Sequence, residues 1–166
     1  EKQSLITREL EEVLTREDLE ALLAQGKPLK HYIGFEISGE IHLGTGIAAM
    51  QKVKDLADAG VACTIFLADW HTWINDKLGG DRDAIKRVAV DYFKEGLSTC
   101  YDVLGGNLDD LTFVLGSDLY HANDAYWETV VGIAKHTTLN RAKRSISILG
   151  RESNEEIDMA KMFYPI

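Results

Sequence analysis

A histidine and two glycines follow a short apolar run near the start of the chain, in an arrangement that suits an anion. The segment reads Tyr32-Ile33-Gly34-Phe35-Glu36-Ile37-Ser38-Gly39-Glu40-Ile41-His42-Leu43-Gly44-Thr45. This pattern predicts a strand that ends in a turn of small residues, after which Gly44 opens a helix. Backbone N–H groups and the helix dipole favour anions at such a place, so a triphosphate would fit. The spacing matches neither the Gly-x-Gly-x-x-Gly fingerprint nor the phosphate loop that ends in Gly-Lys-Ser/Thr.

Two further predicted strands end in polar loops, and the three loops are expected to meet. The run from Val61 to Ala68 is apolar and rich in β-branched residues, which predicts a strand buried on both faces. Leu111 to Leu115 is a third strand. Ligands of parallel α/β sheets collect beyond the carboxyl ends of the strands. The segments placed there are Gly34 to Ser38, Asp69 to His71 and Gly116 to Tyr120.

Helical patterns separate these strands and position the loops. The expected helices run to about Gln25, from Gly44 to Ala59, from Asp81 or Asp83 to Val103, and from Asn123 almost to the end. Strands that alternate with helices predict an α/β fold with a parallel, doubly wound sheet. Residues 1–29 form an N-terminal helical extension in this interpretation.

Composition narrows the class of protein. The chain has 166 residues and a net charge of −9, which argues against coating nucleic acid through bulk electrostatics. The longest apolar stretch, 61–70, is too short to cross a bilayer, so no membrane partner is expected. Cys63 and Cys100 show no paired spacing, and nothing at the N-terminus looks like a signal peptide. A cytoplasmic setting is therefore predicted.

The segment His42-Leu43-Gly44-Thr45 resembles the His-x-Gly-x signature of class I aminoacyl-tRNA synthetases. Together with Tyr32 to Glu36, it resembles the tyrosyl-tRNA synthetases of the archaeal–eukaryotic type. The resemblance implies a Rossmann-like nucleotide-binding fold, of which residues 30–166 would be the first part and 119–166 a helical connecting region. Members of that family are about twice as long, so the chain is expected to be an incomplete, truncated piece.

The resemblance assigns an ATP site to the first loop. His42 and Thr45 would act in catalysis, and ATP would enter as a substrate with Mg²⁺, without a protein-bound metal. The residues implied at the nucleotide are Gly34, Phe35, Glu36, Ser38, His42, Gly44 and Thr45. Thr45 departs from the family's His or Asn, and Ile37 replaces a common Pro, which predicts a looser turn.

The resemblance also assigns a pocket for L-tyrosine. The phenol of Tyr32 would hydrogen-bond the phenol of the substrate, although a core aromatic is the alternative interpretation of this residue. The other residues implied at the amino acid are Phe66, Ala68, His71 and Tyr164. Leu119 and Tyr120 depart from the family pattern after Gly116-Ser117, which puts the polar lining of this pocket in question.

One basic segment lies near the end of the chain. Arg141, Lys143 and Arg144 belong to a Thr-Thr-Leu-x-Arg-Ala-x-Arg-Ser match that starts at Thr137. A solvated helix face is the ordinary interpretation of such a run. The resemblance instead implies contact with tRNA(Tyr) or with the second subunit of a homodimer.

The implied activity is ATP-dependent formation of tyrosyl-adenylate and transfer of tyrosine to tRNA(Tyr). The chain alone is expected to be weakly active or inactive, because the opposing half of the site is missing from it. Three alternatives stay open: a tryptophanyl-tRNA synthetase, a small nucleotidyltransferase, and a synthetase-derived module that binds RNA or protein without catalysis.

Overall fold

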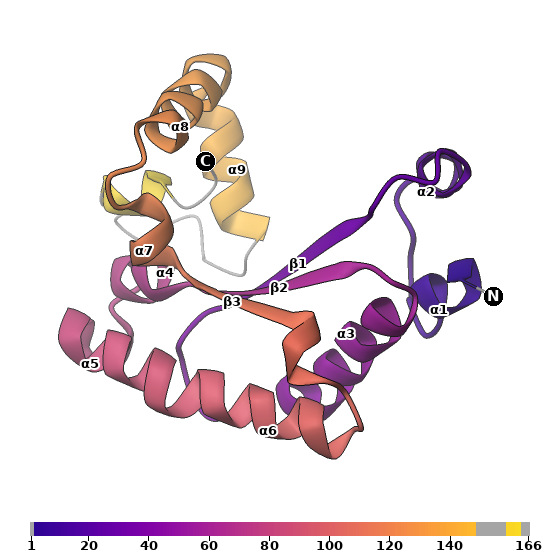
Figure 1. Cartoon of the computed structure of the whole chain (residues 1–166). Coiled ribbons are helices and arrows are strands. Elements are labelled where there is room, and N and C mark those ends of the chain that lie inside the picture. Colours follow the sequence, from indigo (N-terminus) through magenta and orange to yellow (C-terminus); the bar gives the residue numbers. More distant parts are fainter. Residues whose placement is uncertain (1, 149–158, 164–166) are drawn as a thin grey trace.

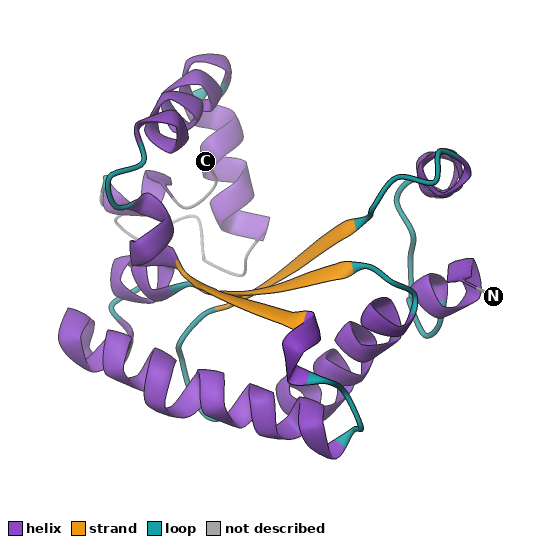
Figure 2. Ribbon diagram, viewed as in Figure 1, coloured by secondary structure: helices purple, strands orange, loops and turns teal. Residues whose placement is uncertain are grey.

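Three parallel strands form the centre of the fold. A computed structural model describes residues 2–148 and 159–163, with side chains as far as residue 145 in the first range. The strands are β1 (Lys30–Phe35), β2 (Ala62–Leu67) and β3 (Leu111–Leu115), in the order β1-β2-β3 (Figure 2). Tyr32 of β1 lies beside Thr64 of β2, which lies beside Thr112 of β3. The three predicted strands and their parallel pairing are confirmed.

Helices make both crossovers between the strands. The first is η1 (Leu43–Ala48) with α3 (Ala49–Asp58), as predicted, and the second contains α4 (Asp69–Ile74), η2 (Lys77–Gly80), α5 (Arg82–Val88), η3 (Ala89–Lys94), α6 (Glu95–Val103) and η4 (Leu108–Asp110). Asp81 caps α5 by accepting from the N–H groups of Asp83 and Ala84, at 3.0 Å each. Of the helices described, none is long and apolar enough to cross a membrane.

Both ends of the chain are helical, as predicted, and each is divided into separate helices. The opening segment forms two helices, α1 (Lys2–Thr7) and α2 (Arg16–Ala24). After β3 the chain forms α7 (Gly116–Tyr120), α8 (Asp124–His136), α9 (Leu139–Ile148) and η5 (Ala160–Phe163). Extended backbone at Thr137 separates α8 from α9, so the predicted continuous helix is wrong at that point.

One face of the sheet carries the core. Helices α3, α5 and α6 lie together along that face (Figure 1). Ile65 of β2 is completely buried there, together with Met50 of α3 and Leu97 of α6. Gly46 and Gly96 let these helices approach, since a Cβ on either would lie within 3.0 Å of the Ile41 side chain. The first loop is thereby packed against α6.

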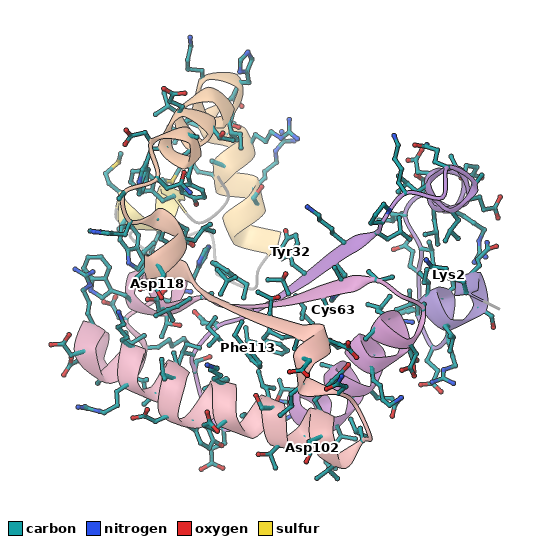
Figure 3. All side chains as sticks on the ribbon, viewed as in Figure 1. Lys2, Tyr32, Cys63, Asp102, Phe113 and Asp118 are labelled. Atoms are coloured by element: carbon teal, nitrogen blue, oxygen red, sulfur yellow. The ribbon has the colours of Figure 1, made fainter. Side chains whose placement is uncertain are left out.

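The other face of the sheet is open. Tyr32 is 77% exposed, and Thr64 and Phe66 are half-buried, whereas their neighbours Ile65 and Leu67 are buried. Figure 3 shows Tyr32 standing on the side of β1 that faces away from α3 and α6. Within the described residues β2 is therefore fully buried on one face only, and Tyr32 does not take the alternative place of a core aromatic. Both crossovers that the structure describes cover the same face.

Candidate active site

His42 caps the helix that follows the first loop. Its Nδ1 accepts the N–H of Gly44 at 3.1 Å, and its own N–H donates to Oγ1 of Thr45 at 3.1 Å. The Thr45 hydroxyl donates back to the carbonyl of His42 at 3.3 Å. Because Nδ1 is an acceptor here, the proton of the neutral imidazole lies on Nε2. The exposed ring therefore presents an N–H donor at the helix N-terminus, which is suited to a phosphate oxygen.

The same geometry explains Gly44 and changes the expected role of Thr45. A Cβ on Gly44 would lie 3.0 Å from Cε1 and 3.1 Å from Nδ1 of His42. Glycine at position 44 thus makes room for the capping imidazole, independently of any contact with a nucleotide. The single hydroxyl proton of Thr45 is used within the cap, so Thr45 fixes His42 and keeps only an acceptor lone pair for other contacts.

Glu36 links the first loop to α4. Its carboxylate accepts from the side-chain amide of Asn75 and, at 3.3 Å, from the hydroxyl of Ser38. Phe35, by contrast, is buried in the core, so only its backbone could face a nucleotide. The side chains of Glu36 and Ser38, both predicted to bind ATP, thus form hydrogen bonds that hold the loop in place.

Ile37 also ties the loop to α4. Its side chain is completely buried, and its N–H donates to Oγ1 of Thr72 at 2.7 Å. A proline could not make this bond, because it has no N–H. The prediction that Ile37 loosens the turn is therefore wrong.

Asp69 joins the second loop to the third. It is 5% exposed, and its Oδ1 accepts the N–H groups of Trp70 and Ser117, at 2.9 Å each. A Cβ on Gly116 would lie 2.6 Å from the same oxygen, so glycine is required for this approach. Together with the bond between the Ala68 N–H and the Phe35 carbonyl, at 2.9 Å, these contacts confirm that the three loops meet at one edge.

Aromatic side chains gather beside the predicted tyrosine pocket. The rings of His71 and Tyr120 each meet Phe66 edge-on, with centroids 6.5 and 6.4 Å apart. Behind them lies a mainly apolar cavity of about 260 Å³. Its lining is formed by Trp70, His71, Trp73, Ile74, Tyr120, Tyr126, Trp127, Val130, Ala160 and Phe163. Of the predicted tyrosine-binding residues, His71 lines this cavity.

Burial sets the protonation of the two polar rings at this wall. It lowers the pKa of His71, against the opposing effect of the nearby carboxylates of Glu36 and Asp69. Burial also raises the pKa of Tyr120, and the neighbouring Tyr126 adds to this. At neutral pH the wall is therefore uncharged, which suits an aromatic side chain.

Ala68 is buried at the edge itself, directly after β2, and does not line the cavity. Other predicted site residues lie apart from this edge or cannot be placed. Arg141, Lys143 and Arg144 are exposed on α9, and Tyr164 lies outside the described residues. Within 2–148 and 159–163, no three His, Cys, Asp or Glu side chains form a group that could hold a metal.

Sequence reasoning missed the residues that connect the loops. Asp69 was placed in the second loop without a role, and the structure shows that its carboxylate holds two backbone N–H groups. Thr72 and Asn75 were not singled out, because their partners are 35 and 39 residues away in sequence. The departure from proline at Ile37 was the one available signal, since it adds an N–H that needs an acceptor.

Comparison with known proteins identifies the family. A model described as tRNA synthetases class I (W and Y) matches residues 24–166, and the chain belongs to this family. The tyrosine–tRNA ligase of Thermococcus kodakarensis is 57% identical over 155 residues, which cover 93% of this chain and 41% of that protein. The chain spans less than half the length of this relative.

Solved structures agree with this assignment. The tyrosyl-tRNA synthetase of Pyrococcus horikoshii, complexed with L-tyrosine, matches with a TM-score of 0.91 and 50% identity, over 99% of this chain and 45% of that one. The tryptophanyl-tRNA synthetase of Plasmodium falciparum matches with a TM-score of 0.68 and 24% identity, over 90% and 38% of the chains. The second likeness shows the shared fold alone.

Proposed function

We propose that the full-length protein containing this chain is a tyrosine–tRNA ligase. It activates L-tyrosine with ATP and transfers it to tRNA(Tyr). The observation that carries the proposal is the hydrogen bond between Ile37, in the loop that leads to His42, and Thr72 of α4, which holds the two parts of the site together at one edge of the sheet. The chain in which it occurs is 57% identical to a tyrosine–tRNA ligase. That edge holds an anion-binding helix start beside an uncharged aromatic wall.

The reaction needs positioning rather than a covalent enzyme intermediate. The carboxylate of tyrosine attacks the α-phosphate of ATP, pyrophosphate leaves with Mg²⁺, and the adenylate passes tyrosine to the terminal ribose of the tRNA. The Nε2–H of His42 and the backbone at Gly34, Ser38 and Gly44 contact the phosphates and ribose. Donors fixed before the reaction stabilise the charge that develops at the α-phosphate.

Tyr32 selects the amino acid in this proposal. Its hydroxyl stands on the open face of the sheet, where it can bond the substrate phenol, while Phe66, Ala68 and His71 form the wall around the ring. Tyr164 would hold the ammonium group. A site that satisfies a substrate hydroxyl rejects phenylalanine, because buried polar groups are then left unpaired.

The remaining partners follow from the exposed surface. Arg141, Lys143 and Arg144 place positive charge on α9, which suits the phosphates of tRNA or a second subunit of a homodimer. Both interactions, and a cytoplasmic location, are part of the proposal.

The test is ATP–pyrophosphate exchange by the full-length protein with each of the twenty amino acids. We expect exchange with tyrosine, much less with phenylalanine or tryptophan, and little or none by the isolated 166-residue chain. The variant Tyr32→Phe should reduce the preference for tyrosine over phenylalanine, whereas Tyr101→Phe, at the end of α6 against Gly106, should not. Exchange that depends on tryptophan, or on no amino acid, would reject the proposal.

A further inference from the structure

Thr72 lies within α4, and its side-chain oxygen joins this helix, which begins after Ala68, to the turn at Ile37. Its side chain is completely buried. The hydroxyl donates to the carbonyl of Ala68 at 2.9 Å and accepts the N–H of Ile37 at 2.7 Å. Both bonds are shielded from water, so they restrain the groups more firmly than exposed bonds would.

The two segments carry different parts of the proposed site. Ala68 and His71 belong to the wall of the tyrosine pocket, and Ile37 begins the turn that leads to His42. The contact between Glu36 and Asn75, the residue that follows α4, joins the same two segments again. Nothing places Thr72 itself against a substrate, because its hydroxyl is used within the protein.

We propose that Thr72 is a positioning residue that couples the tyrosine pocket on α4 to the ATP-binding turn. This inference rests on the proposed function. The bond exists because residue 37 is isoleucine, since the proline that the family resemblance leads one to expect has no N–H to donate. In this chain a buried hydrogen bond therefore supplies the restraint that a proline ring would give the turn.

The coupling predicts that each substrate changes the affinity for the other, and this change can be measured. Tyrosine bound against His71 restrains α4, and through Thr72 it restrains the turn from Ile37 to His42. ATP then meets a turn that is already ordered, so bound tyrosine strengthens ATP binding, and the effect is reciprocal. Loss of the Thr72 acceptor removes this advantage while the residues that touch tyrosine stay in place.

The kinetic test uses the full-length protein with Thr72→Val and Thr72→Ser. In tyrosine-dependent exchange, Thr72→Val should lower kcat/KM for ATP about tenfold, as for the loss of one buried hydrogen bond. The Kd for tyrosine measured without ATP should change less than about twofold, because the residues that touch tyrosine stay in place. Thr72→Ser keeps the hydroxyl and should restore the wild-type values. The matched control is Thr99→Val, which removes a hydroxyl that bonds the Glu95 carbonyl on the exposed side of α6.

A second pair of variants tests whether the effect of Thr72 passes through its bond to the N–H of Ile37. In the background Ile37→Pro the N–H is absent, so adding Thr72→Val should change kcat/KM for ATP no further. A full tenfold loss in that background would overturn the proposal. A weakening of tyrosine binding without ATP as large as the loss in kcat/KM for ATP, or loss of stability with unchanged kinetics, would also overturn it by showing a purely structural role.

Amide hydrogen exchange separates this inference from the proposed function. If the wild-type protein shows no tyrosine-dependent pyrophosphate exchange, the proposed function fails. The positioning role is then decided by the amides from Ile37 to His42. These should exchange faster in Thr72→Val than in Thr72→Ser or Thr99→Val, and equal rates in all three variants would overturn the inference.

Discussion

The two faces of the sheet have different tasks, although their side chains alternate along the same strands. On the face covered by α3 and α6, Ile65 is completely buried within the core. On the opposite face, Thr64 is half-buried and Tyr32 is 77% exposed. The covered face holds the fold together, and the open face and its carboxyl edge carry the residues proposed for chemistry. The residues that stabilise the fold and those proposed to contact substrate are thus separated by a single residue step along a strand.

The largest expected effect is on the covered face. Ile65→Ala should lower the free energy of unfolding by about 2–5 kcal/mol, because it removes buried apolar contacts and leaves a cavity. Urea unfolding followed by circular dichroism measures this change. A loss below about 1 kcal/mol would show that the core on this face is not tightly packed.

The second-largest effect on stability is expected at the carboxyl edge of the sheet, where Asp69 lies. Asp69→Ala should cost about 2–3 kcal/mol, since the buried N–H groups of Trp70 and Ser117 lose their acceptor. Asp69→Asn retains an acceptor oxygen and serves as the control in the same urea experiment. Equal losses for both variants would show that the charge of Asp69, rather than its bonds to the backbone, is what matters.

The free energy of unfolding should depend on pH through His31, which lies on the covered face of the sheet. Burial and the nearby Lys52 lower its pKa, and its Nδ1 is buried without a partner among the described residues. Because the unfolded state then binds more protons, the free energy of unfolding should fall as the pH drops below about 6.5. The variant His31→Leu should lose less stability between pH 7 and pH 5 than the wild type does. The part that remains is assigned to His71, whose pKa is also lowered. An unchanged loss in His31→Leu would contradict the burial of this ring.

The smallest effect is expected one residue away from Ile65. Thr64→Ala changes a side chain on the open face, so the free energy of unfolding should change by no more than about 0.5 kcal/mol. The same urea titration serves both variants. If Thr64→Ala costs as much as Ile65→Ala, the two faces are equally packed in solution and the comparison between them is wrong.

Patterns of neighbouring residues predicted the strands and helix starts that position the site. The strand patterns that end at Phe35 and at Leu115, and the helix start at Asp81 or Asp83, are short-range patterns, and the structure confirms the strands and places the cap at Asp81. The meeting of the three loops was also predictable, because the carboxyl ends of parallel strands share an edge. Phe35 shows the limit of this reasoning. Its motif suggested a nucleotide contact, but its place in the strand alternation turns the side chain into the core.

The sequence by itself determined the parallel α/β sheet, the helix that opens near Gly44 and the family to which the chain belongs. These depend on neighbours within a few residues, whose spacing can be read directly. Only the tertiary structure decided which face of β2 is covered, what Asp69 holds, and that Thr72 receives the N–H of Ile37. Those outcomes depend on segments more than thirty residues apart, and packing rather than local spacing brings them together.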